Sequence, residues 1–165
     1  MQEILNGLEV EQVRKDASEA RQNPEKCTMV RKLSAEWAGG TRARVYSEDK
    51  EIFVGGEKDF GAMTVALASL LACEIDLIAT QATARGIDIE KLSIDGTGDF
   101  NPARYLDGGV GPNAGFQKIE YTLRIKSKNA TREQLEDLVQ LCETSSPVGD
   151  TFSRSVPISM KLQLD

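Results

Sequence analysis

The stretch 61–86, GAMTVALASLLACEIDLIATQATARG, decides the fold of this chain. Its first half consists almost entirely of apolar or small residues, and it closes with Gly86, the residue type that commonly terminates an α-helix. We therefore predict one long helix from about Asp59 or Gly61 to Arg85. A helix that is apolar on all sides is a buried helix. In a chain of 165 residues, such a helix indicates that a second copy helps to cover it.

The segments on both sides of this helix are predicted to form strands and two further helices. The spacing of apolar residues predicts helices at 7–22 and 131–143, and the second opens with a capping box. Alternation of apolar and polar residues between turn signals predicts six strands, at 28–37, 42–47, 52–54, 91–99, 116–127 and 156–164. The connections 101–115 and 145–155 are expected to be loops. The sequence therefore predicts one α+β domain with mostly antiparallel pairing.

A glycine pair, Gly96 and Gly98, lies inside one of these strand patterns. A phosphate-binding loop would need a helix directly after the glycines, and no helical pattern follows them. We therefore predict a β-bulge at this position.

Charge and composition restrict the classes of function. The net charge of -6 disfavours a nucleic-acid partner, because such affinity comes mainly from Lys and Arg neutralising phosphates. The longest apolar run, 65–73, is much shorter than the ~20 residues that span a bilayer, so no membrane partner is expected. The chain has no histidine, which excludes Ser-His-Asp and Cys-His catalysis and the usual mixed zinc sites. We expect no metal and no cofactor.

The three cysteines are the remaining candidates for chemistry. Cys27, Cys73 and Cys142 are odd in number and widely spaced, which is typical of reduced thiols in the cytoplasm rather than of a disulfide framework. No secretory signal pattern opens the chain, which also favours the cytoplasm. Packing alone would explain Cys73 and Cys142, because free cysteine is among the residues most often buried. Cys27 is interpreted as an incidental thiol.

A reactive Cys73 would need a positive side chain from another part of the chain. Thiolates form beside cations, and the neighbours of Cys73 on its own helix, Glu74 and Asp76, are both acidic. The cation would come from the Gly-Gly hairpin or from the segment near the C-terminus. The candidates are Arg42, Arg44 and Arg154.

Two segments together carry a resemblance to a known family. Residues 56–73, GEKDFGAMTVALASLLAC, place a cysteine on a helix of small residues, and residues 146–152, SPVGDTF, precede the closing strand. In this order they resemble the OsmC-like (osmotically inducible protein C) family, which includes the organic hydroperoxide resistance proteins. The resemblance covers roughly Val30 to Leu164, so the chain is interpreted as a single domain over 1–165 with an added N-terminal helical segment, 1–26. It implies an intertwined homodimer whose two central helices are wrapped by antiparallel sheets.

The resemblance also implies thiol-dependent reduction of organic hydroperoxides in oxidative or osmotic stress. A peroxidatic cysteine attacks the peroxide and becomes a sulfenic acid, a second cysteine condenses with it, and an external dithiol restores both. Cys73 falls at the peroxidatic position. Ser146 stands where the family has its second cysteine, and Cys142, four residues earlier, is the alternative resolving thiol.

The charged partners of the family's reactive cysteine are replaced by apolar residues in this chain. Met63 stands at the position of the family's Glu, and Phe53 stands at the position of its Arg. Arg42 or Arg44 would then serve as the replacement cation.

Three functions remain open on these observations. The first is a thiol protein that acts on hydroperoxides or a related electrophile through Cys73. The second is a non-catalytic dimer that binds a small hydrophobic ligand at the subunit interface, and the third is an interaction dimer without a ligand. The residues expected to line the apolar pocket of the second are Phe53, Phe60, Met63 and Leu70.

Overall fold

The long helix predicted from the sequence is α2 (Ala62–Ala84) in the computed structural model, which describes residues 2–164. Gly61 is its N-cap, and Gly86 follows its C-terminus with a φ of 72°. This left-handed backbone conformation ends the helix, and glycine adopts it without steric strain. The prediction of a central helix ended by Gly86 is confirmed.

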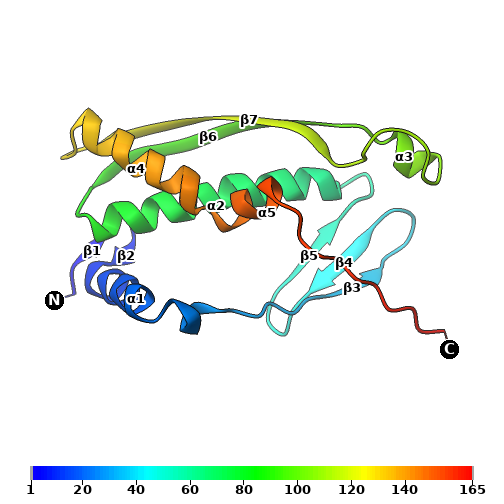
Figure 1. Ribbon diagram of the computed structural model, residues 1–165, viewed down its shortest axis with the longest axis horizontal. Helices are drawn as coiled ribbons and strands as arrows, with labels where there is room; N and C mark the ends of the chain where they lie inside the picture. Colours follow the sequence, from blue (N-terminus) through cyan, green and yellow to red (C-terminus); the bar gives the residue numbers. More distant parts are fainter. Residues whose placement is uncertain (1, 165) are drawn as a thin grey trace.

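Two antiparallel sheets accompany α2. The first is a meander of β3 (Ser34–Trp37), β4 (Ala43–Tyr46) and β5 (Glu51–Val54), and the second is a long hairpin of β6 (Ile89–Phe100) and β7 (Phe116–Ser127). A short ladder of β1 (Ile4–Leu5) and β2 (Leu8–Glu9) lies near the N-terminus. Figure 1 shows α2 running along the β6–β7 hairpin, with the meander on the other side of the helix.

Further helices flank α2. They are α1 (Val10–Gln22), the short α3 (Ala103–Leu106), α4 (Arg132–Ser145) and α5 (Pro147–Ser153), with a 3-10 turn at Pro24–Cys27. The predicted capping box is present, because Thr131 Oγ1 accepts from the Gln134 amide while the Gln134 side chain accepts from the Thr131 amide. Both α4 and α5 pack against α2.

The fully buried core lies where α2 and α4 meet. Ile78 and Ala82 project from successive turns of α2, and Leu138 and Cys142 project from successive turns of α4. Residues four apart share one face of a helix, so each helix buries one stripe here. Burying side chains such as Ile78 and Leu138 contributes about 1.5–3 kcal/mol each.

Most of the apolar surface of α2 is left uncovered by its own chain. By length and composition alone, α2 is long and apolar enough to cross a membrane, and only 17% of its most apolar window is buried. The contacts of α2 with β6, α1, α4 and α5 instead give it the central place in the fold. An uncovered apolar helix in this position is the feature that a second copy of the chain would bury.

The predictions for the C-terminal part of the chain were wrong in two places. The expected loop 145–155 is largely helix α5, which Ser146 opens as its N-cap and Pro147 enters at the first position. The expected strand 156–164 has no regular structure, and side chains along it are strongly exposed, such as Ile158 (94%) and Met160 (89%). A strand requires a neighbour to complete its hydrogen bonds, and none of the described strands lies beside this segment.

The predicted β-bulge at Gly96 and Gly98 is also wrong. Both residues pair regularly with β7, opposite Tyr121 and Ile119. A Cβ atom would lie 2.9 Å from the Leu71 side chain at Gly96, and 2.5 Å from the Phe116 ring at Gly98. The side chains of Leu71 and Phe116 therefore pack so closely against β6 that only glycine fits at these two positions.

Candidate functional site around Cys73

Cys73 lies on α2 opposite the junction between α4 and α5. Its side chain is half-buried, and the Ser146 hydroxyl is 3.6 Å from its sulfur, within reach to donate a hydrogen bond. Ser146 is itself only 3% exposed. A side chain 73 residues away in sequence is thus held against the candidate thiol.

The helix junction fixes the position of this hydroxyl. The Ser146 amide donates to the Cys142 carbonyl at the end of α4, and Ser146 Oγ accepts from the Gly149 amide at the start of α5. A serine hydroxyl has one proton to donate and two lone pairs, so it can cap α5 and donate to Cys73 at the same time. Ser146 supplies the cap, and Pro147 follows it at the first helical position, where proline is favoured.

Ser146 also borders a cavity of about 850 Å³. Met63 and Leu70 lie on the same face of α2 and line this cavity together with residues of β7 and α5. Leu70 is 4% exposed. Its volume falls within the range of small-molecule sites, about 300–1,000 Å³. Cys73 therefore lies behind a hydroxyl that opens into a site large enough for an organic substrate.

The other two thiols differ from Cys73. Cys142 is 1% exposed and lies in the core between α2 and α4. Burial, and secondarily the charge of Glu74, raise the pKa of its thiol to about 11, against a smaller opposing effect of Arg85. A thiol with this pKa is protonated at neutral pH and is a poor resolving nucleophile without rearrangement. Cys27 is exposed, ends the 3-10 turn and faces the Asn23 carbonyl.

The two arginines proposed as replacement cations are engaged within the meander. Arg42 Nε donates to Asp59 at 2.7 Å, and the guanidinium stacks 3.8 Å from the centroid of the Phe53 ring. Arg44 pairs with Glu51 at 2.7 Å and with Glu36 at 3.8 Å. Within residues 2–164, neither arginine makes a hydrogen bond to Cys73.

The four residues expected to line an apolar pocket are brought together only in part. Met63 and Leu70 share the cavity beside Ser146. Phe53 lies instead under the Arg42 guanidinium, and Phe60 projects outward with 69% of its surface exposed.

The sequence interpretation did not single out Glu74 as an interior residue. This carboxylate is 2% exposed, although free of hydrogen bonds and ion pairs within residues 2–164. The signal was present in the spacing, because Leu70, Glu74, Ile78 and Ala82 recur every four residues and are all buried.

Comparison with known proteins identifies the family. The family model described as OsmC-like protein matches residues 55–161, and the chain belongs to this family. None of the curated proteins compared with the sequence matches it.

Solved structures with the same fold come from several bacteria. An OsmC-like protein from Mycoplasma pneumoniae is 24% identical with a TM-score of 0.62, over 76% of this chain and 89% of that one. A hypothetical protein from Aquifex aeolicus is 16% identical with a TM-score of 0.62, over the same shares of each chain, 76% and 89%. An organic hydroperoxide resistance protein OsmC from Legionella pneumophila is 17% identical with a TM-score of 0.53, over 76% of this chain and 91% of that one. At these identities, the likeness shows the fold.

Proposed function

We propose that this chain is a cytoplasmic, thiol-dependent member of the OsmC-like family that reduces organic hydroperoxides through Cys73. The observation that carries the proposal is the contact between the Cys73 sulfur and the buried Ser146 hydroxyl beside an organic-sized cavity. The organic hydroperoxide resistance protein with the same fold supports this direction.

In the proposed reaction, the Cys73 thiolate attacks the terminal oxygen of the hydroperoxide. The O–O bond breaks, the terminal oxygen stays on the sulfur as a sulfenic acid, and the alkoxide takes up a proton from water and leaves as the alcohol. The Ser146 hydroxyl stabilises the negative sulfur by donating a hydrogen bond to it. Met63 and Leu70 would hold the hydrocarbon part of the substrate.

An external dithiol completes the cycle in this proposal. One of its thiols attacks the sulfenic sulfur, releasing water and forming a mixed disulfide, and its second thiol then releases Cys73 as a thiol. The proposal assigns this role outside the chain because Ser146, beside Cys73, carries no sulfur and Cys142 is buried with a raised pKa.

The chain is further proposed to work as a homodimer. The apolar surface of α2 is poorly covered, and the apolar residues of the segment 156–164 are exposed. A second copy of the chain would bury both, and would bring further side chains near Cys73. One of these would be the cation that the thiol lacks within residues 2–164.

A peroxidase assay tests the enzymatic proposal. The wild-type chain with dithiothreitol or dihydrolipoamide is expected to consume tert-butyl hydroperoxide or a fatty acyl hydroperoxide, and Cys73→Ser is expected to lose this activity. Cys27→Ser is the matched control, since it removes an exposed thiol, and it should retain full activity. Equal rates for the wild type and Cys73→Ser would overturn the proposal.

The alternative function is a non-catalytic dimer that binds a small hydrophobic ligand. The cavity lined by Met63 and Leu70 favours it independently of any thiol chemistry. Stabilisation by fatty acyl ligands that is equal in wild type and Cys73→Ser, together with no peroxide turnover, would favour this alternative.

A further inference from the structure

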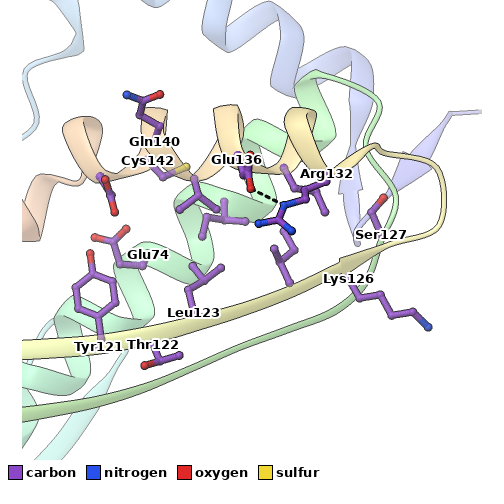
Figure 2. A pocket seen from close by; sticks show the side chains of 15 residues that line it. Glu74, Tyr121, Thr122, Leu123, Lys126, Ser127, Arg132, Glu136, Gln140 and Cys142 are labelled. Atoms are coloured by element: carbon purple, nitrogen blue, oxygen red, sulfur yellow. Dashed lines mark hydrogen bonds and ion pairs between the residues drawn. The ribbon is translucent and has the colours of Figure 1, made fainter.

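A second cavity, of about 820 Å³, lies between β7 and the helices α2 and α4. Figure 2 shows it with Glu74 and Tyr121 at one end, Leu123 in the middle and Arg132 at the other end. Cys73 lines neither this cavity nor the one beside Ser146. Its aliphatic lining is formed by Ile78, Leu123, Ile125, Leu135 and Val139.

The Glu74 end of the cavity holds a carboxylate without a counterion. Glu74 is 98% removed from solvent, since 2% of its surface is exposed, and it has no ion pair or hydrogen bond within residues 2–164. Among the described residues, every side-chain oxygen or nitrogen that is inaccessible to solvent has a hydrogen-bond partner. The Glu74 oxygens have none, so they must be in contact with the two cavities that Glu74 lines. Glu143 lines both cavities as well and is likewise unpaired in this part of the chain.

The pKa shifts of the neighbouring Tyr121 and Cys142 indicate a negative potential at this end. The pKa of Tyr121 is raised by burial and then by the charges of Glu74 and Glu143. Glu74 also contributes to the raised pKa of Cys142. Arg85 opposes that effect at Cys142 but forms no ion pair with either carboxylate among the described residues. A buried carboxylate without a counterion is unfavourable, and a bound cation would supply the missing partner.

The far end of the cavity has a different charge arrangement. Arg132 pairs with Glu136 at 2.7 Å, and Lys126 pairs with Glu90 at 2.6 Å. The two carboxylates at this end are thus already paired, and neither is free to hold a second positive charge on a ligand. Three or more potential metal ligands do not gather anywhere in residues 2–164, so the site is not built for a bare metal ion.

We infer that this cavity binds a small organic monocation with an aliphatic tail, of the alkylammonium class. The ammonium group lies at the carboxylates of Glu74 and Glu143, and the tail lies against Ile78, Leu123 and Leu135. The tail would remove apolar surface from water at these side chains, and the ammonium group would supply the counterion that Glu74 lacks. Because Glu74 and Glu143 also line the cavity beside Ser146, the ammonium site adjoins the site proposed for the thiol chemistry, whereas the tail lies away from it.

Calorimetric titration of the full chain with octylammonium tests the inference. Octylammonium is expected to bind at least tenfold more tightly than octanol, octanoate or 1,8-diaminooctane. These three probes keep the tail but remove the charge, reverse it or add a second one. Absence of measurable octylammonium binding, or equal affinity for octanol, would overturn the inference.

Variants locate the site and separate it from the proposed enzymatic function. Glu74→Gln should weaken octylammonium binding at least tenfold, because it preserves shape and removes the charge. Glu136→Gln is the matched control, since Glu136 lines the same cavity but is already paired with Arg132, and it should bind as the wild type does. Cys73→Ser should also bind normally, whether or not the chain is a peroxidase.

A third carboxylate variant keeps the test decisive. If thermal unfolding shows that Glu74→Gln does not fold, the exposed Glu143→Gln replaces it and should weaken octylammonium binding at least threefold. Unchanged binding in a folded Glu74→Gln or Glu143→Gln protein would contradict the assignment of the site.

Discussion

The Ser146 hydroxyl lies 3.6 Å from the Cys73 sulfur while it caps helix α5. One side chain therefore links the integrity of a helix junction to the environment of the candidate nucleophile. Substitutions at Ser146 can test this link, because threonine retains both the hydroxyl and the capping ability whereas alanine loses both.

Ser146→Ala is expected to slow hydroperoxide consumption about tenfold to a hundredfold, the effect of losing one hydrogen bond of about 1.5–3 kcal/mol to a charged group. It should also lower the free energy of unfolding by about 1 kcal/mol, because the N-cap is lost. Ser146→Thr is the control and should stay close to the wild type in both measurements. A rate unchanged in Ser146→Ala would show that the hydroxyl does not assist Cys73.

Ser146→Cys is expected to introduce an internal resolving thiol. The new sulfur would replace an oxygen already in contact with Cys73, so peroxide should produce a disulfide between positions 73 and 146. Peptide mapping by mass spectrometry before and after treatment measures it. The same treatment of the wild type should leave Cys73 linked neither to Cys142 nor to Cys27.

Gly98→Ala is expected to destabilise the β6–β7 hairpin. The added Cβ would lie 2.5 Å from the Phe116 ring, and relief of such overpacking costs about 1–3 kcal/mol. Gly115→Ala is a suitable control, because a Cβ there meets no atom within 4 Å. Urea unfolding of both variants compares the two costs, and equal stabilities would contradict the packing explanation for Gly98.

Local signals in the sequence were sufficient for much of the fold. The helix α2 was predicted from its uniform apolar composition and Gly86, and the start of α4 from the capping box at Thr131. Helix α5 was missed because its seven residues include a glycine and several polar side chains, although Ser146 and Pro147 are local signals for a helix start.

Properties that depend on distant residues could not be derived from local patterns. The alternation in 156–164 is typical of a strand, but it does not say which strand will pair with it. Likewise, an all-apolar helix does not indicate which side faces α4, and so the burial of Glu74 was not predicted. The ion pair of Arg42 with Asp59 depends on a hairpin geometry that the sequence left open.

The exposed segment 156–164 leads to a prediction about oligomeric state. If a second copy buries it, Ile158→Lys combined with Met160→Lys should convert a dimer into a monomer, as measured by light scattering. Lys161→Glu changes a charge in the same segment without altering its apolar residues, so it should leave the dimer intact. A wild-type chain that is monomeric at high concentration would contradict the homodimer proposal.

The buried thiol of Cys142 predicts a loss of stability in alkaline solution. Its pKa in the folded chain is about 11, raised by burial and by Glu74 from an ordinary value of 9.0. Above pH 9, the unfolded chain releases this proton while the folded chain still holds it, so the folded state binds more protons and stability falls as pH rises. The contribution is fully present below pH 9 and is lost by about pH 11, with a magnitude on the order of 2 kcal/mol.

Urea unfolding between pH 8 and about 11 measures this dependence of stability on pH. Cys142→Ala should be less stable at every pH because of its cavity, but it should lack the loss of stability that the thiol causes in this range. A wild-type slope equal to that of Cys142→Ala would show that the thiol titrates alike in the folded and unfolded chains.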